Sequence, residues 1–448
     1  MEKICFSARH RIFPNKRLKK LILKLIKNKK YAFVLGSNPA LSTAEIFSVF
    51  SGEKNIEVVS LSEEVLIIQS PSLDDGLIDR LGGTIKIIEI SREINIDEYS
   101  SDVAVKNLAK LILDTANQNQ RKFHFGVSVY RLDAPEKMIG KLAKSLKYIC
   151  VNLKKNLKEE NIGLAFINIK ERSLSSASVI KNKLNRAGGM EGILVASKTG
   201  ILLGKTIAVQ NIDLYTQLDV GRPVRDIVSG TTPPKLAKIM INLAGERSDA
   251  SMLDPFCGSG TFLQEMILLG YKNIIGTDIS EKAVSDTKKN LDWLKERFKT
   301  QETKYDVYQS DVVSLEEHIK PDTIDAVVSE GYLGPALRAP LRADQSDELI
   351  SKLNIFYKKV FGVLVKLLKK DGVIVFALPI FRTEGGLQTP PILADLSQFE
   401  LKIVNPLDGI KNSFDKFSSG RNSIIYSRPD QFVLREIIVL RKEDVPAV

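Results

Sequence analysis

The chain has 448 residues, of which 44% are hydrophobic and 27% are charged. These values are typical of a globular protein with several hydrophobic cores, and they exclude a disordered chain, a collagen-like fibre and a coiled coil. No apolar run reaches the roughly 20 residues of a membrane-spanning helix, so we expect no membrane partner. The three cysteines are far apart and there are three histidines. This pattern predicts neither a disulfide framework nor a His/Cys metal site, and it fits a reducing compartment.

The formal net charge is +11, and it comes almost wholly from residues 1–30, which hold eleven Lys or Arg residues and one acid, Glu2. Such a segment can attract nucleic-acid phosphates, lie on an anionic membrane or act as a transit peptide. A solvated basic arm is an equally good interpretation. We treat residues 1–30 as a basic N-terminal extension without an assigned role.

Residues 31–98 predict a small α+β domain. Strands are expected at 31–35, 56–60, 65–68 and 86–90, and helices are expected after Ser42 and at 73–80. The first helix is indicated by Ser42-Thr-Ala-Glu45, which has the spacing of a capping box. The order β-α-β-β-α-β is typical of a ferredoxin-like unit.

Residues 99–212 predict a second unit, with a helix over 103–114, a strand over 123–130 and a long helix over 136–157. The long helix has apolar residues at helical spacing on one face. Its other face carries lysines: Lys141, Lys144, Lys147, Lys154 and Lys155. A lysine face is most often simply solvated, and on charge alone RNA contact is the less common interpretation.

Residues 213–245 predict a linker that ends in a helix over 233–243. The apolar stripe of this helix is expected in the core, and it consists of Leu236, Ile239, Met240 and Leu243. From 246 to 448, strands and helices alternate as in a parallel sheet. Strands are expected at 251–253, 273–278, 305–309, 326–329 and 373–378, and helices at 261–269, 281–298 and 347–370. Residues 422–426 and 431–440 predict an antiparallel hairpin at the sheet edge.

The strongest motif is Asp254-Pro-Phe-Cys-Gly-Ser-Gly-Thr261, which joins an expected strand to an expected helix. Ligands of open α/β sheets bind at such a position. Gly258 and Gly260 lack the Cβ atoms that would keep a ligand away from the backbone at the helix N-terminus, and Asp254 can accept hydrogen bonds directly or through water. The third glycine of the dinucleotide fingerprint and the lysine of a P-loop are missing, which disfavours NAD and ATP.

Two further acids end the next two expected strands. Asp278 is placed to bind both ribose hydroxyls, and Asp311 to accept from an adenine amino group. Each acid alone is more often a strand-end cap, but together they predict an S-adenosylmethionine site. The residues expected to hold this cofactor are Thr232, Asp254, Pro255, Phe256, Gly258, Gly260, Thr261, Asp278, Ile279, Asp311 and Val312.

The sequence around these residues resembles a known family. DPFCGSGT is similar to motif I of the amino-methyltransferases that act on exocyclic nitrogens. The stretches 219–226 (DVGRPVRD) and 232–244 (TPPKLAKIMINLA) resemble the segment before motif I in the tRNA guanosine N2-methyltransferases that modify position 10. Arg222 and Arg225 in this segment fit surface ion pairs and phosphate contacts equally well.

This resemblance covers nearly everything after residue 30 and implies an α/β fold. It implies a Rossmann-like S-adenosylmethionine-dependent methyltransferase domain at 246–448, reached through the linker at 213–245. Ahead of it, the resemblance implies a ferredoxin-like domain at 31–98 and a THUMP RNA-binding domain at 99–212.

The strand end that carries catalysis in this family departs from the family's pattern. The family has Asp/Asn-Pro-Pro-Tyr/Phe, where this chain has Ser329-Glu330-Gly331-Tyr332. The lone pair of guanine N2 is delocalised into the ring, so acceptors that bind its hydrogens favour methyl transfer. We expect Ser329 and Glu330 to be these acceptors and Tyr332 to stack on a flipped base. Gly331 is expected to loosen a turn that proline would fix.

We therefore expect a cytoplasmic, monomeric enzyme that transfers a methyl group from S-adenosylmethionine to the exocyclic N2 of a tRNA guanosine, at position 10 by resemblance. Its expected partner is tRNA, and no DNA partner or metal ion is expected. Two alternatives stay open: another tRNA guanosine such as position 6, and a non-catalytic RNA-binding protein with a diverged methyltransferase domain. A DNA amino-methyltransferase is disfavoured, because it leaves the THUMP-like half unexplained.

Overall fold

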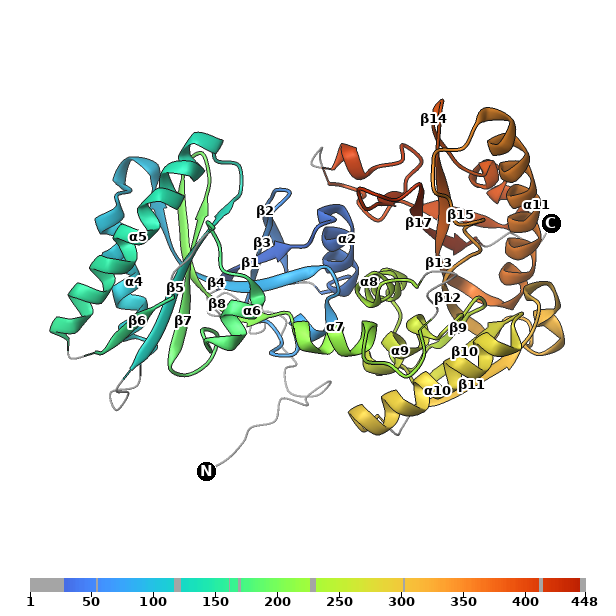
Figure 1. Cartoon of the computed structure of the whole chain (residues 1–448), viewed down its shortest axis with the longest axis horizontal. Helices are drawn as coiled ribbons and strands as arrows, with labels where there is room; N and C mark the ends of the chain where they lie inside the picture. Colours follow the sequence, from blue (N-terminus) through green and yellow to red (C-terminus); the bar gives the residue numbers. More distant parts are fainter. Residues whose placement is uncertain are drawn as a thin grey trace, which may run out of the picture.

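A computed structural model of the chain describes residues 28–53, 55–116, 122–160, 162–167, 171–225, 231–300, 303–410 and 414–443. Most of the basic N-terminal extension lies outside these residues. The described residues form two sheets, one in the N-terminal half and one in the C-terminal half of the chain (Figure 1). None of the described helices combines the length and the apolar character needed to cross a bilayer.

The N-terminal half contains, in chain order, β1 (Lys29–Leu35), α2 (Pro39–Val49), β2 (Glu57–Leu61), β3 (Val65–Ser70), α3 (Leu77–Arg80), β4 (Thr84–Asn95), η1 (Ile96–Glu98), α4 (Ser101–Leu113), β5 (Phe123–Arg131), α5 (Glu136–Glu159), β6 (Leu164–Phe166), α6 (Ser176–Lys181), β7 (Gly189–Ala196), β8 (Gly200–Val209) and α7 (Ile212–Asp219). The first six elements follow the expected β-α-β-β-α-β order. Their strands pair in the order β4-β1-β3-β2, which gives the ferredoxin-like sheet.

Both N-terminal units share one sheet of eight strands, in the order β2-β3-β1-β4-β8-β7-β5-β6. The shared strand pair is β4 and β8, which run antiparallel from Lys86↔Val209 to Asn95↔Gly200. β4 is longer than the five-residue strand expected at 86–90, and it pairs with β1 at one edge and with β8 at the other. The two units are therefore joined by backbone hydrogen bonds as well as by the chain.

The long helix α5 has the two faces that its sequence predicts. Its apolar residues are buried against the sheet and α4, and they include Leu142, Leu146, Ile149, Leu153 and Leu157. The lysines of the opposite face are exposed: Lys141, Lys144, Lys147, Lys154 and Lys155. Burial of the apolar stripe fixes the helix, so the charged face points away from the protein.

The C-terminal half contains α8 (Pro234–Ala244), β9 (Ser251–Asp254), α9 (Thr261–Leu268), β10 (Asn273–Asp278), α10 (Glu281–Phe298), β11 (Lys304–Gln309), η2 (Val312–Glu317), β12 (Ile324–Glu330), α11 (Ala343–Leu367), β13 (Leu368–Thr383), β14 (Gly386–Gln388), η3 (Pro391–Ala394), η4 (Leu396–Phe399), β15 (Leu401–Val404), η5 (Asp415–Phe417), β16 (Ile424–Tyr426) and β17 (Val433–Lys442). The strands pair in the order β11-β10-β9-β12-β13-β17-β15, and the first five are parallel. The α/β fold class expected from the sequence is confirmed.

The strand order reverses between β9 and β12, where open α/β sheets bind their ligands at the carboxyl ends of the strands. The C-terminal hairpin corrects one expectation. β16 and β17 pair antiparallel, but β17 is an inner strand that lies between β13 and β15. Its apolar residues on both faces explain this position, because an inner strand is covered on both sides.

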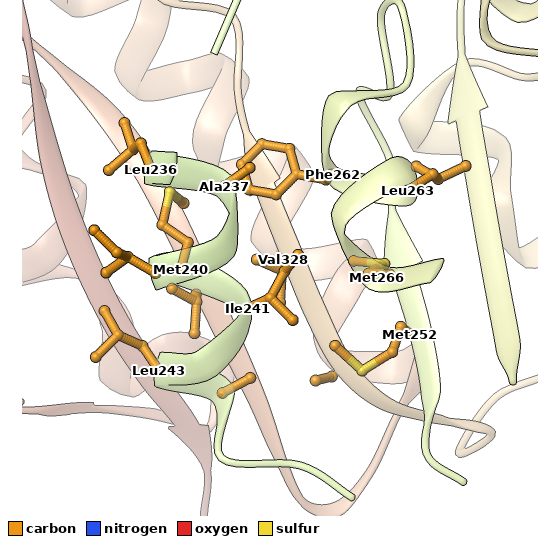
Figure 2. Close-up of a cluster of buried hydrophobic side chains, with 14 of the residues drawn as sticks. Leu236, Ala237, Met240, Ile241, Leu243, Met252, Phe262, Leu263, Met266 and Val328 are labelled. Atoms are coloured by element: carbon orange, nitrogen blue, oxygen red, sulfur yellow. The ribbon is translucent and has the colours of Figure 1, made fainter. Parts of the chain in front are cut away.

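The helix α8 packs its apolar residues against α9 and the sheet, as the stripe in its sequence predicts. Figure 2 shows Val328 of β12 between α8 and α9, with Ile241 of α8 on one side and Phe262 and Met266 of α9 on the other. Left-handed Gly245 ends the helix, with φ +70°, and the chain then enters β9. The position of α8 thus sets where β9 and its loop begin.

The polar residues of α8 bind the ferredoxin-like unit, which lies beside it in Figure 1. Asn242 Nδ2 donates to Glu45 Oε1 and to the Arg80 carbonyl oxygen, both at 2.7 Å. Ser48 donates back to the Asn242 carbonyl oxygen at 2.6 Å. Lys238 donates to the Asp79 carbonyl oxygen at 2.9 Å. One helix therefore carries the core of the C-terminal half on one face and the contact with the N-terminal half on the other.

Candidate active site

The loop between β9 and α9 contains two glycines in left-handed conformations. Gly258 has φ +53° and Gly260 has φ +84°, values that residues with a side chain rarely adopt. A Cβ at Gly260 would lie 3.0 Å from Cγ2 of Thr287, whereas a Cβ at Gly258 would meet no atom within 4 Å. Gly260 thus allows the loop to pack on α10, and Gly258 leaves open space beside the backbone.

Asp254 ends β9 with a fully buried carboxyl group. Its Oδ1 accepts from the Ser329 hydroxyl at 2.5 Å and from the Phe256 backbone N–H at 3.2 Å. Its Oδ2 is shielded from solvent and has no hydrogen-bond partner among the described residues. Burial raises the pKa of Asp254 to about 7, while the two hydrogen bonds lower it. One oxygen of a buried carboxyl group therefore remains open to a donor.

Asp278 ends β10 and Asp311 follows the neighbouring strand β11, as expected. Asp278 Oδ2 accepts from the Gly258 N–H at 3.0 Å, and its Oδ1 accepts from the Ser280 N–H at 2.9 Å. Asp311 is exposed and accepts from the Val313 N–H at 3.1 Å, which caps η2. Both acids therefore act as structural caps, and an ionised carboxylate still has further lone pairs for a ligand.

The other residues expected at the cofactor site fall into three groups. Ile279 is exposed beside Asp278. The ring of Phe256 lies 6.0 Å from the rings of Phe356 and Phe376, so it packs between α11 and β13. Four further residues are buried: Thr232, Pro255, Thr261 and Val312. Within the described ranges, no group of three or more His, Cys, Asp or Glu side chains could hold a metal ion.

At the end of β12, two of the three residues predicted to act on the target base are already held by side chains of this protein. Ser329 is fully buried and donates to Asp254. Glu330 accepts two hydrogen bonds from Arg435, at 2.5 Å from Nε and at 2.9 Å from Nη2. Tyr332 is 55% exposed as a residue, while its carbonyl oxygen accepts from the Tyr357 hydroxyl at 2.7 Å. Tyr332 is thus fixed through its backbone and offers a free aromatic face.

Gly331 occupies a position with no room for a side chain. A Cβ there would lie 2.5 Å from Cε1 of Phe376 and 3.0 Å from Cε1 of Tyr357. The packed rings therefore require glycine, because a proline in this backbone would collide with them. The departure from the Pro-Pro pattern goes together with an aromatic cluster beneath the turn.

Two arginines belong to this region but were not placed there by sequence reasoning. Arg435 lies on β17, and the signal was the adjacent pair Arg435-Glu436 inside an otherwise apolar strand. Arg222 is also buried, and its Nη1 donates to Thr261 Oγ1 at 2.9 Å. A surface ion pair, one of the two interpretations left open for Arg222, is therefore wrong. Arg225 in the same segment is exposed, so both a surface ion pair and a phosphate contact stay open for it.

Comparison with known proteins matches the C-terminal half. The family model described as "Methyltransferase domain" matches residues 246–398. Among solved structures, the crystal structure of TrmN from Thermus thermophilus aligns with 92% of this chain and 99% of its own chain, with a TM-score of 0.51 and 13% identity. At this identity the likeness supports the fold alone, a Rossmann-like methyltransferase domain after an α+β half.

Curated relatives are similar to this chain in sequence. The tRNA (guanine(10)-N2)-dimethyltransferase of Methanothermobacter thermautotrophicus is 31% identical over 150 residues, which are 34% of this chain and 39% of the relative. The chain thus matches about two fifths of that relative's length. The probable tRNA (guanine(10)-N2)-dimethyltransferase of Methanothermococcus thermolithotrophicus is 31% identical over 146 residues, which are 32% of this chain and 78% of the relative. With a relative of this identity matched over most of its length, the chain belongs to the tRNA (guanine(10)-N2)-dimethyltransferase family.

Proposed function

We propose that this protein transfers methyl groups from S-adenosylmethionine to the exocyclic N2 of a tRNA guanosine, at position 10. The observation that carries the proposal is the 31% identity to relatives named for this reaction. The strand ends of β9, β10 and β12 support it, because they bring the predicted cofactor residues next to the predicted base-binding residues. The tRNA substrate implies a cytoplasmic enzyme. One chain holds both halves, so a monomer is sufficient.

The residues present fit the cofactor. Asp254 Oδ2 is buried and free to accept from an ammonium group, and Gly258 leaves space beside the backbone. Asp278 would accept from the ribose hydroxyls, and Asp311 from the adenine amino group. Exposed Ile279 would cover one face of the adenine. When bound, S-adenosylmethionine supplies a methyl group activated by the adjacent sulfonium.

Catalysis then depends on how the end of β12 holds the target base. Tyr332 stacks on the flipped guanine, since its ring is exposed and its backbone is fixed by Tyr357. Glu330 accepts from the N2 amino group and stabilises the positive charge that develops there. Arg435 fixes the orientation of the Glu330 carboxylate through two hydrogen bonds. Ser329 positions Asp254 and borders the same strand end.

The RNA-binding half is proposed to be a THUMP domain that anchors the acceptor end of the tRNA. The exposed lysines of α5 support this proposal, because they form a positively charged surface that can bind phosphates. The contacts of α8 with α2 hold this half against the catalytic half. The separation between anchor and active site would then select the nucleotide that is methylated.

The test is incubation of the wild-type protein with unmodified transcribed tRNA and labelled S-adenosylmethionine, followed by mass mapping of the modified nucleoside. N2-methylated guanosine at position 10 is the expected result, and a tRNA with adenosine at position 10 is the matched control. Methylation at position 6 instead would support the alternative that the enzyme modifies another tRNA guanosine. Cofactor and tRNA binding without methyl transfer would favour a non-catalytic RNA-binding protein. The observation that favours this alternative is that Ser329 and Glu330 already bond to Asp254 and Arg435 of the same protein.

Tyr332→Ala and Tyr332→Phe form a matched pair of variants for the same assay. The alanine variant is expected to lose about tenfold or more in methyl transfer, because base stacking on the ring is lost. The phenylalanine variant keeps the ring and should transfer methyl groups at close to the wild-type rate. Equal methyl-transfer rates for the two variants would show that Tyr332 does not stack on the target base.

A further inference from the structure

The segment that precedes α8 is held against the loop between β9 and α9. Asn290 of α10 makes the connection with its side-chain amide. Its Nδ2 donates to the carbonyl oxygens of Val224 at 2.9 Å and Ser259 at 2.8 Å, and its Oδ1 accepts from the Val224 N–H at 3.0 Å. Residues 219–225 therefore form part of the wall of this loop.

Arg222 lies in this segment and is 4% exposed. Its Nη1 donates to the hydroxyl of Thr261, the first residue of α9, while its Nε is shielded from solvent and has no partner. In the part of the chain that the structure describes, no carboxylate lies within ion-pair distance of Arg222, and Asp219 acts on it only at longer range. Burial lowers the pKa of Arg222, which reflects the cost of a buried charge without a counterion.

Arg222 has a counterpart of opposite charge at the other end of the same loop. Asp254, at the start of the loop, is fully buried and has an unpartnered Oδ2. Thr261, which holds Arg222, ends the loop at the N-terminus of α9, where the helix dipole also favours an anion. Buried polar groups are nearly always hydrogen-bonded, so two unsatisfied groups of opposite sign beside one loop indicate a ligand that carries both charges.

The methionine end of S-adenosylmethionine is such a ligand, since it has an α-ammonium group and an α-carboxylate on the same carbon. The adenine and ribose carry no charge. We propose that Arg222 binds the α-carboxylate of the cofactor, while Asp254 accepts from its α-ammonium group. The inference rests on the proposed function only in that it requires S-adenosylmethionine as the ligand.

Binding of S-adenosylmethionine and of its decarboxylated analogue, measured by calorimetry, tests this assignment without methyl transfer. The wild-type protein is expected to bind S-adenosylmethionine about tenfold or more tightly than the decarboxylated analogue, because a charge-assisted hydrogen bond is lost with the carboxylate. Arg222→Met should bind both compounds with the same, weak affinity. Arg225→Met is the matched control, because Arg225 is an exposed arginine of the same segment, and it should retain the wild-type discrimination.

Each outcome separates this inference from the proposed function. Equal affinity of the wild-type protein for the two compounds would overturn the role of Arg222 while leaving the methyltransferase intact. An equal loss of affinity for both compounds in Arg222→Met would assign the arginine to folding of the loop and overturn the inference as well. If Arg222→Met does not fold, the inference is tested with Arg222→Lys and with the affinities of the wild-type protein for the two compounds. Failure of the wild-type protein to bind either compound would reject the proposed function together with this inference.

Discussion

Single buried charges in the catalytic half are satisfied in different ways. Five buried charged residues belong to ion pairs: Lys238 and Glu265 with each other, Asp286 with Lys282, Arg435 with Glu330 and Glu436 with Arg421. Asp254 and Arg222 differ from them, because each has a buried atom without a hydrogen-bond partner and neither has an ion-pair partner among the described residues. The buried oxygens of Glu265 also lack a hydrogen bond, but Lys238 Nζ lies 3.3 Å from one of them. A protein rarely retains such atoms without a use, so these two residues are where binding energy for a ligand is available.

The proposed contact between Asp254 and the cofactor predicts that cofactor affinity depends on pH. Its pKa is raised to about 7, so the carboxyl group is largely neutral at pH 6 and largely ionised at pH 8. Since an α-ammonium group prefers the ionised form, the dissociation constant for S-adenosylmethionine should fall by about tenfold between these pH values. Asp254→Asn should bind weakly at both. A wild-type affinity that does not change with pH, measured by calorimetry, would contradict this assignment.

The same pKa predicts how the ligand-free protein responds to pH. Asp254 binds a proton more tightly in the folded protein than in the unfolded chain, where an aspartate has a pKa of 3.8. The folded state therefore gains stability from this group at low pH and loses it as the pH rises from about 4 to about 7. Urea unfolding across this range should show a larger loss in the wild-type protein than in Asp254→Asn, because Glu45, whose pKa burial also raises to about 7, contributes equally in both proteins.

Glu330 and Arg435 form a largely buried ion pair whose members depend on each other. Removing one partner, in Glu330→Ala or Arg435→Ala, leaves an uncompensated charge and should lower the free energy of unfolding by about 3–5 kcal/mol. The double variant should lose clearly less than the sum of the two. Additive losses in urea unfolding would show that the pair is not coupled.

For catalysis, Glu330→Gln separates charge from packing. The amide keeps the size of the side chain but has only one oxygen to accept from the target amine. Turnover should fall about tenfold or more, while the dissociation constant for S-adenosylmethionine stays unchanged. An equal change in both quantities would count against Glu330 as an acceptor.

At the scale of elements, α8 connects the two halves through direct backbone contact. Gly82, in the loop between α3 and β4, packs so closely on α8 that a Cβ would lie 2.4 Å from the Lys235 carbonyl oxygen. The buried polar contacts of Glu45 and Asn242 lie next to this point. The glycine is therefore required by the approach of α8 and not by a turn conformation.

Gly82→Ala should force α8 and the ferredoxin-like unit apart and cost about 1–3 kcal/mol, as expected for overpacking at a fixed backbone. Gly140→Ala is the matched control. It lies in the exposed part of α5 with no atom within 4 Å of its Cβ position, so it should be stabilising by about 0.5–1 kcal/mol. Unfolding curves for the two variants should therefore shift in opposite directions.

At the scale of the whole molecule, the eight-stranded sheet makes the two N-terminal units one structural body. Its centre holds a buried ion pair, in which Lys86 Nζ of β4 lies 2.6 Å from Glu191 Oε1 of β7. Glu191 also accepts from the hydroxyls of Ser128 and Thr206, both at 2.6 Å. The ferredoxin-like unit thus supplies the lysine, and the second unit supplies the carboxylate and the hydroxyls.

Lys86→Met should destabilise both units together by about 3–5 kcal/mol, because Glu191 is left buried without its cation. The double variant Lys86→Met/Glu191→Gln removes the charge but keeps an oxygen for the hydroxyls, and it should recover part of the loss. Hydrogen exchange of β4 and β8 measures the effect. Loss of protection in β4 alone would show that the units unfold independently.

The sequence by itself determined the elements and their order. Alternating strands and helices and the stripe of α8 depend on neighbours a few residues away, so their bounds are close to those of the structure. The capping box expected at Ser42 is wrong, because α2 begins at Pro39 with Asn38 as its N-cap. The Ser42 hydroxyl instead donates to the carbonyl oxygens of Asn38 and Gly83. The strand ends that carry Asp254, Asp278 and Ser329 followed from the same local pattern.

Only the tertiary structure decided which side chains meet. Arg435 lies 105 positions after Glu330, and Arg222 lies 39 positions before Thr261, so no local periodicity connects them. The joining of two units into one sheet, and the place of β17 between β13 and β15, likewise depend on long-range pairing. The physical reason is that hydrophobic periodicity records which face of an element is buried, whereas hydrogen bonds and ion pairs depend on the partner that folding brings to that face.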